Sequence, residues 1–197
     1  MVEKNSGKGA ADENFPVGSQ LIARAHRPTV MAYYAFARAA DDIADDHELT
    51  SAEKIARLDR FDAGLRGTDD DPALTTAQRC GAALDAAGGQ LRHASDLLSA
   101  FRQDAVKTRY ADWAELMDYC SRSASPVGRF LLALHGEDEA GFAASDPLCD
   151  ALQVLNHLQD LKKDLNALDR VYLPGDWMAE AGVASADLNA ARESAGL

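Results

Sequence analysis

Apolar residues recur along this chain at the three- and four-residue spacing of amphipathic helices, and short polar breaks separate the apolar stretches. Prolines are few and no run of β-branched residues occurs, so the chain favours helices over strands. The pattern therefore predicts an all-α fold. The expected helices cover about 17–26, 28 into the acidic segment 41–46, 50–65, 73–86, 91–108, 112–132, 146 through the second acidic segment 156–164, and a weak last helix from 187.

Capping residues and prolines mark the ends of several expected helices. Pro28 suits a first helical turn. The N-terminal capping signatures are Thr50 with Glu53, Asp71 before Pro72, and Asp112 with Glu115. The residues expected on the buried side of the helix at 91–108 are Leu97, Leu98, Phe101 and Val106. Pro126 lies inside the helical pattern of 112–132, so a kink is expected there, and a bent core helix without a functional role is the equal alternative.

Length, charge and cysteine content narrow the class of protein. The 197 residues suit one domain with a sizeable core. A net charge of −12 argues against nucleic-acid binding, so an anionic substrate would need local basic residues or a metal. Three cysteines without metal-type spacing predict free thiols in a reducing, cytoplasmic setting. The polar segment 1–14 is expected to be a disordered leader, and no apolar stretch is long enough to span a membrane.

The first acidic segment repeats aspartate at helical spacing. Arg38, Asp41 and Asp45 are expected to share one helix face, with Asp42 and Asp46 on the neighbouring stripe. A solvated acidic helix end is the simpler interpretation of this segment alone. However, carboxylates stacked on a helix repel one another, and acids near a helix C-terminus oppose the helix dipole. A bound cation is therefore an alternative that a second acidic segment would strengthen.

The second acidic segment supplies such a partner. Its polar stripe, with offsets of three, four and four residues, consists of Gln153, Asn156, Asp160 and Asp164. The residues expected to supply apolar packing opposite this stripe are Leu152, Leu155, Leu158 and Leu165. Oxygen ligands of this kind suit Mg²⁺, which is commonly held by one or two carboxylates together with waters and substrate phosphates. His157 points off the stripe and is interpreted as a packing residue, which disfavours zinc and di-iron. Lys162, Lys163 and Arg170 are candidates to pair with acids or phosphate, although the two lysines are interpreted as a solvated face.

Three motifs in chain order resemble those of the squalene/phytoene synthases. The matching segments are YYAFARAADDIAD at 33–45, YCSRSASPVG at 119–128, and NHLQDLKKD at 156–164 followed by RVYLP at 170–174. The resemblance implies an all-α isoprenoid-synthase (terpenoid synthase) helical bundle. It also implies that family members are longer, so 15–197 is expected to be a partial domain that lacks the last helices and leaves an apolar wall open. Within the family, the chain is most similar to the hydroxysqualene synthase branch in ENFPV at 13–17, AADDIAD at 39–45 and RSA at 122–124.

The resemblance also implies roles for individual residues. The Mg²⁺ ligands that it implies are Asp41, Asp45, Asn156, Asp160 and Asp164. The catalytic residues that it implies are Asp41, Asp45, Asp160, Asp164 and Tyr119. The substrate-binding residues that it implies are Arg38, Gln153 and Asn156 for diphosphate, with Phe36, Ala124, Val127 and Leu131 lining an apolar tunnel beside Tyr119. Tyr119 would stabilise a carbocation through its ring or donate to diphosphate, and the sequence does not decide between these roles.

The activity implied by the resemblance is Mg²⁺-dependent conversion of presqualene diphosphate to hydroxysqualene, within hopanoid biosynthesis. Presqualene diphosphate synthase would then be a partner enzyme that supplies the substrate. The alternatives are a presqualene diphosphate, dehydrosqualene or phytoene synthase, a non-catalytic relative that acts as a scaffold, and an acidic bundle without a ligand. Intact acids in both motifs disfavour the scaffold. Substrate chain length, oligomeric state, activity of the chain alone and peripheral contact with membranes stay open.

Overall fold

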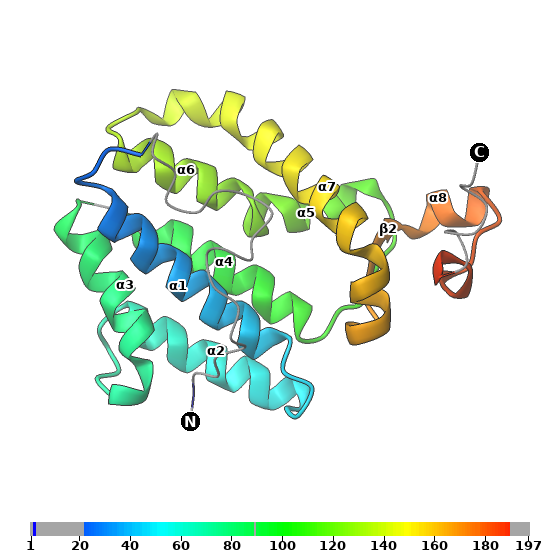
Figure 1. Ribbon diagram of the computed structural model, residues 1–197, viewed down its shortest axis with the longest axis horizontal. Coiled ribbons are helices and arrows are strands. Elements are labelled where there is room, and N and C mark those ends of the chain that lie inside the picture. Colours follow the sequence, from blue (N-terminus) through cyan, green and yellow to red (C-terminus); the bar gives the residue numbers. More distant parts are fainter. Residues whose placement is uncertain (1, 3–21, 89, 190–197) are drawn as a thin grey trace.

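The computed structural model describes residues 2, 22–88 and 90–189, and within them the predicted all-α fold is confirmed (Figure 1). The helices are α1 Arg27–Ala44, α2 Ser51–Leu65, α3 Thr75–Ala86, α4 Leu91–Asp104, α5 Trp113–Ser123, α6 Ser125–Leu134, α7 Phe142–Leu168 and α8 Gly175–Glu180. Short 3₁₀ turns cover Pro72–Leu74, Glu139–Gly141 and Ser185–Asn189. The predicted leader 1–14 lies outside the described residues apart from Val2.

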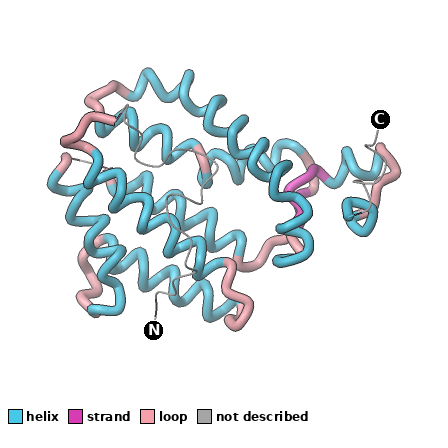
Figure 2. The backbone as a smooth tube through the Cα atoms, in the orientation of Figure 1, coloured by secondary structure: helices cyan, strands magenta, loops and turns pink. Residues whose placement is uncertain are grey.

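The main core lies between α1, α2, α3, α4 and α6, which Figure 2 shows as neighbouring helical rods. Phe36 of α1 stacks on Phe61 of α2 with their ring centroids 5.1 Å apart. Tyr33, one turn before Phe36, stacks on Phe130 of α6 at 4.0 Å. These pairs join the N-terminal helices to α6, so one continuous core fixes α1 and its acidic C-terminal end.

Most predicted helix starts are confirmed. Pro28 lies in the first turn of α1. Thr50 caps α2, because its hydroxyl accepts from the Glu53 amide while the Glu53 carboxylate accepts from the Thr50 amide. The Asp71 carboxylate accepts from the amide of Ala73, and α3 follows after a 3₁₀ turn. The N-cap of α5 is Asp112, as predicted.

Some element bounds differ from the prediction. The described part of the segment predicted as helix 17–26, residues 22–26, forms a bend and a turn, and the rest lies outside the described residues. Helix α4 ends at Asp104 rather than at 108, and Val106 is 63 % exposed instead of buried. Helix 112–132 is two helices, α5 and α6, which separate at Ala124. Pro126 lacks an amide proton and its ring crowds the preceding turn, so the chain starts a new helix instead of bending one.

Helix α7 begins at Phe142, one turn earlier than predicted, and holds Pro147 near its start. It ends at Leu168, and the C-cap residue Asp169 has a left-handed φ of 48°. Among the leucines expected to pack opposite the polar stripe, Leu152, Leu155 and Leu158 are exposed, so that prediction is wrong for the described residues. None of the helices within 22–88 and 90–189 combines the length and apolar character that crossing a bilayer requires.

A short parallel ladder ties the end of α7 to the end of α4, and the sequence did not predict it. Strand β1 Arg109–Tyr110 pairs with strand β2 Val171–Pro174, with Arg109 opposite Val171. The Val171 amide also donates to the carbonyl of Thr108 at 2.9 Å. The predicted last helix is a 3₁₀ turn in which the Asp187 carboxylate accepts from the Ala184 amide. The ladder places the chain after α7 beside α4, which builds one end of the cavity described next.

Candidate functional site

A cavity of about 980 Å³ lies between the C-terminal end of α1 and the polar face of α7, with α4, α5 and β2 also lining it. The predicted site residues that line it are Arg38, Asp41, Asp45, Tyr119, Gln153, Asn156, Asp160 and Asp164. The two acidic segments are more than a hundred residues apart in sequence, yet their aspartates face one space. The cavity therefore has an acidic wall on each of two helices.

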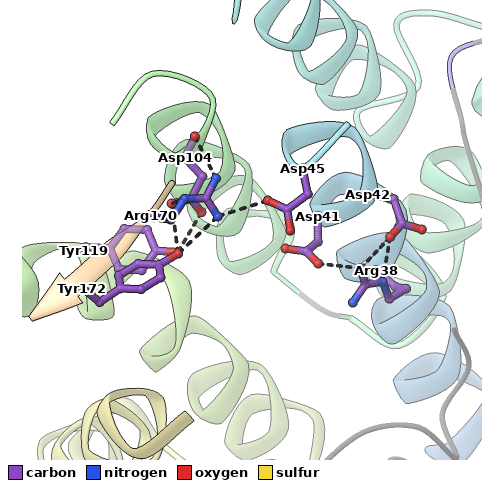
Figure 3. A network of polar contacts seen from close by, with 8 residues as sticks. All are labelled: Arg38, Asp41, Asp42, Asp45, Asp104, Tyr119, Arg170 and Tyr172. Carbon is purple, nitrogen blue, oxygen red and sulfur yellow. Dashed lines mark hydrogen bonds and ion pairs between the residues drawn. The ribbon is translucent and has the colours of Figure 1, made fainter. Parts of the chain in front are cut away.

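Arg38 organises the α1 wall. Its Nη2 lies 2.7 Å from Asp41 Oδ2 and 2.5 Å from Asp42 Oδ1, and its Nε also donates to Asp42 Oδ1 at 3.0 Å (Figure 3). The Asp42 side chain is 7 % exposed, whereas a third of the Asp41 side chain meets the cavity. One guanidinium thus joins the two stripes of the helix, and Asp41 is more accessible to a ligand than Asp42.

Like charges raise the cost of ionising both walls. Burial, followed by the neighbouring Asp45, raises the pKa of Asp41, and Arg38 only partly offsets this. Burial and then Asp160 raise the pKa of Asp164 to about 6, and Asp45 on the opposite wall adds to the rise. The field of Asp45 therefore reaches across the cavity to α7. A cation between the walls would relieve this repulsion.

Arg170 connects the acidic walls to the floor of the cavity. It follows α7, and its side chain is 6 % exposed. Its Nη1 donates to Asp45 Oδ1 at 3.1 Å, and its Nη2 donates to the main-chain carbonyl of Asp104 at 2.9 Å, at the C-terminal end of α4 (Figure 3). Arg170 was a candidate to pair with acids or phosphate, and the structure pairs it with Asp45 and Asp104.

Two tyrosines complete this floor. The Tyr119 hydroxyl donates to Asp104 Oδ2 at 2.7 Å, and the Tyr172 hydroxyl donates to Asp104 Oδ1 at 3.4 Å. Burial raises the pKa of both tyrosines well above the usual value, so both remain proton donors. His157 stacks on Tyr172 with ring centroids 3.5 Å apart, in line with its interpretation as a packing residue. Burial, together with Arg170, lowers the pKa of His157 to about 3.

Asp104 and Tyr172 are site residues that were not predicted from the sequence. A signal for Asp104 was present, because it lies seven residues after Leu97 and four after Ala100, on the face that the helix pattern already assigned to the interior. An acid that continues an apolar helical stripe is buried and needs a partner. Tyr172 had no comparable signal, since its position depends on the β1–β2 ladder.

Four residues predicted to line an apolar tunnel do not line this cavity: Phe36, Ala124, Val127 and Leu131. Phe36 is fully buried in the main core against Phe61, because the face of α1 that carries it is opposite to the acidic one. Leu131 packs against the same core, and Ala124 is buried where α5 and α6 meet. Val127 is 38 % exposed at the start of α6. These four residues therefore do not belong to this cavity, and their place in an apolar tunnel stays a prediction.

The donors around the cavity fit Mg²⁺ in one particular way. Within the described residues, no three His, Cys, Asp or Glu side chains lie close enough together to enclose a metal ion by themselves. Mg²⁺ seldom uses an all-protein cage, and it is usually held by one or two carboxylates with waters and substrate phosphates. Two separated pairs of aspartates that face a wide, polar cavity match that mode of binding. The fit therefore requires a ligand that brings its own oxygens.

Comparison with known proteins identifies the family of this chain. The sequence profile of the squalene/phytoene synthase family matches residues 9–197. Hydroxysqualene synthase of Sinorhizobium fredii is 48 % identical over 183 residues, which are 93 % of this chain and 62 % of that protein. Hydroxysqualene synthase of Rhodopseudomonas palustris is 47 % identical over 196 residues, which are 99 % of this chain and 66 % of that protein. This chain thus spans just under two thirds of these relatives.

Solved structures share the fold. A squalene synthase from Alicyclobacillus acidocaldarius superposes with a TM-score of 0.75 at 33 % identity, covering 93 % of this chain and 69 % of that one. A dehydrosqualene synthase in complex with a ligand gives a TM-score of 0.67 at 27 % identity, covering 81 % of this chain and 56 % of that one. The helical bundle seen here is therefore the isoprenoid-synthase fold of these enzymes.

Proposed function

Because this chain belongs to the squalene/phytoene synthase family, we propose that it performs Mg²⁺-dependent prenyl diphosphate chemistry, converting presqualene diphosphate to hydroxysqualene with release of diphosphate. The proposed branch rests on identity, since the hydroxysqualene synthases match at 44–48 %. The presqualene diphosphate synthase of Zymomonas mobilis matches at 32 % and phytoene synthase of Mycobacterium tuberculosis at 34 %. The observation that carries the proposal is the pair of acidic walls facing one cavity.

The proposed metal ligands are the acids of the two walls, Asp41 and Asp45 on α1 and Asp160 and Asp164 on α7, with the amide oxygen of Asn156 beside them. Bound Mg²⁺ would supply Lewis-acid stabilisation of the negative charge on the leaving diphosphate. Burial and the repulsion between neighbouring carboxylates both raise the free energy of ionising Asp41 and Asp164. This favours binding of a diphosphate together with cations over binding of either one alone.

The basic and aromatic residues of the chain would act on the organic part and on the leaving group. Arg38 and Arg170 lie beside opposite ends of the α1 wall and present fixed guanidinium groups to diphosphate oxygens. The electron pair of the carbon–oxygen bond leaves with the diphosphate, and a carbocation remains near the ring of Tyr119. The cyclopropane ring of this cation rearranges and opens, and a water oxygen then forms the new carbon–oxygen bond and gives its proton to solvent. The sum is substrate plus water to alcohol plus diphosphate, so no nicotinamide is required.

The substrate would come from an enzyme that makes presqualene diphosphate, which is what the name of the Zymomonas mobilis relative says of that protein. We propose a synthase of that kind as the partner enzyme. We also propose a cytoplasmic location, and contact with the membrane surfaces that hold the lipid substrate and product. These three statements rest on the chemistry of the substrate and on the family, and each is open to separate test.

A product assay tests the proposed reaction. The purified chain is incubated with Mg²⁺ and either presqualene diphosphate or farnesyl diphosphate, and the lipids are extracted for mass spectrometry, with Asp160→Asn as the inactive control. The Rhodopseudomonas palustris relative serves as the positive control. A parallel reaction uses a fusion of this chain with the part of that relative that follows the matched residues. Product from the fusion alone would show that the chain by itself lacks part of the cavity, whereas product from neither protein would point to the wrong substrate.

The products distinguish the candidates. Hydroxysqualene from presqualene diphosphate supports the proposal, and loss of product in Asp160→Asn supports the assigned walls. Presqualene diphosphate, dehydrosqualene or phytoene from prenyl diphosphates would move the chain to a rival synthase. If the chain and the fusion are both folded but inactive while the relative is active, the non-catalytic scaffold is favoured.

A further inference from the structure

The most buried carboxylate beside the cavity, Asp104, has no role in the mechanism above. It is the last residue of α4, and its side chain is 3 % exposed. Burial raises the pKa of this carboxyl to about 6, and Arg170 and the Tyr119 hydroxyl pull it back toward the ionised form. A carboxylate buried at a helix C-terminus, where the dipole opposes it, is costly to retain. Its partners indicate what it does.

The partners of Asp104 come from three separate elements and converge on it. Tyr119 of α5 donates to Oδ2 at 2.7 Å, and Tyr172 of β2 donates to Oδ1 at 3.4 Å. Arg170 lies between α7 and β2, with its Nε 3.9 Å from Oδ1. The same guanidinium donates through Nη2 to the main-chain carbonyl of Asp104. Asp104 therefore contacts Arg170 with both its side chain and its backbone.

The other end of the Arg170 guanidinium reaches the proposed metal wall. Nη1 donates to Asp45 Oδ1 at 3.1 Å, and also to the Tyr172 hydroxyl at 3.4 Å. Figure 3 shows Arg170 placed between Asp104 on one side and Asp45 on the other. When the oxygens of Asp45 are engaged by a ligand, they are no longer available to Arg170. Asp104 is then the carboxylate that still holds the guanidinium in place.

We propose that Asp104 is a positioning residue, which fixes the Arg170 guanidinium and the Tyr119 hydroxyl at the cavity floor so that Arg170 is aimed at the diphosphate beside Asp45. The inference rests on the proposed function for the identity of the ligand. The placement of Arg170 by Asp104 is a separate claim about the ligand-free chain. Asp104 acts through Arg170, and it does not contact the reacting atoms.

Two readouts test the two parts of this proposal. The first is NMR of isotope-labelled arginine in the ligand-free protein, with the Arg170 guanidinium signals assigned by their loss in Arg170→Lys. The wild type should give sharp guanidinium signals because the Asp104 carboxylate lies beside Nε and also holds the Tyr172 hydroxyl that accepts from Nη1. Asp104→Asn keeps the main-chain bond to Nη2 but removes this charge, so it should broaden the Nε and Nη1 signals. The second is calorimetric titration with pyrophosphate in the presence of Mg²⁺. Asp104→Asn should weaken binding about tenfold, which corresponds to one charge-assisted contact of roughly 1.4 kcal/mol.

A double-mutant cycle separates positioning from a general structural effect. In an Arg170→Gln background, Asp104→Asn should change the affinity for pyrophosphate by less than about twofold, because the residue through which it acts is gone. Asp146→Asn is the matched control, since Asp146 accepts two hydrogen bonds from Arg129 at 2.9 and 2.6 Å away from the cavity lining. That control should lower thermal stability and leave both the Arg170 signals and the affinity unchanged.

Each further outcome has a defined meaning. Unchanged Arg170 signals in Asp104→Asn, or an equal loss of affinity in both backgrounds, would overturn the positioning role. If the wild type binds no pyrophosphate, the proposed function fails, and the Arg170 signals alone decide whether Asp104 positions the guanidinium. If Asp104→Asn does not fold, Tyr119→Phe removes the hydroxyl that holds Asp104. The same broadening of Arg170 is then expected, and sharp signals would overturn the role.

Discussion

Replacing Asp164 by asparagine should stabilise the ligand-free protein while removing a proposed metal ligand. Burial, Asp160 and Asp45 raise the pKa of Asp164 from 3.8 to about 6, so the ionised carboxylate destabilises the folded state at neutral pH. A rise of this size would correspond to about 3 kcal/mol for a fully shielded carboxyl. Partial contact with solvent reduces the gain to roughly 1–2 kcal/mol.

The assay is thermal unfolding at several pH values without divalent cations. A gain of 1–2 kcal/mol raises the melting temperature of a domain of this size by about 2–8 °C. The sign follows from linkage: the folded pKa lies above the unfolded one, so the wild type loses its disadvantage as pH falls through 6 toward 3.8. The advantage of Asp164→Asn should therefore be full above pH 7 and absent near pH 4.

The control is Asp146→Asn, which removes an acid that is paired with Arg129 and should lower the melting temperature at pH 7. Pyrophosphate with Mg²⁺ should raise the melting temperature of the wild type but not that of Asp164→Asn. Destabilisation by Asp164→Asn at pH 7 in the absence of ligand would refute the reasoning. It would mean that the two walls are not under mutual repulsion in the folded protein.

Two other predictions test the surroundings of the site. His157 is buried with its pKa lowered to about 3, so below pH 6.5 this side chain is protonated in the unfolded chain but not in the folded one. Between pH 6.5 and 5, chemical denaturation should therefore show that the unfolding free energy of the wild type falls by about 1–2 kcal/mol relative to that of His157→Phe. An equal pH dependence of both proteins would show that the folded state accepts the proton. Phe36 belongs to the core, so Phe36→Ala should lower the unfolding free energy by about 3–5 kcal/mol. The milder Phe36→Leu should change the affinity for Mg²⁺ and pyrophosphate by less than about twofold relative to the wild type. A large loss of affinity would show that Phe36 shapes the cavity.

Local signals in the sequence predicted the helices and the acidic walls well. The Thr50–Glu53 capping pair and the i, i+4 aspartates depend on neighbours within one helical turn, so they can be read without tertiary structure. The sequence also predicted that the acidic segments 33–45 and 156–164 face each other, and in the structure residues of both line one cavity.

The sequence could not predict contacts that depend on long-range packing. Tyr172 meets Asp104 and His157 only because the two-residue strand β1 pairs with β2, and a ladder so short has no detectable hydrophobic period. The direction of Phe36 was also ambiguous, since the same helix buries one face in the core and lines the cavity with another. The split at Pro126 was missed because a proline predicts an interruption but not its size.

The central claim is that both acidic walls bind one Mg²⁺–diphosphate unit, and thermal unfolding with Mg²⁺ and pyrophosphate tests it most directly. At a concentration one hundred times the dissociation constant, a ligand stabilises the folded state by about 2.7 kcal/mol. The wild type should therefore melt about 5–10 °C higher with both components. Neither component alone should have this effect, and Asp41→Asn or Asp160→Asn alone should abolish it. A rise that persists in either variant, or that needs no Mg²⁺, would contradict a site shared by the two walls.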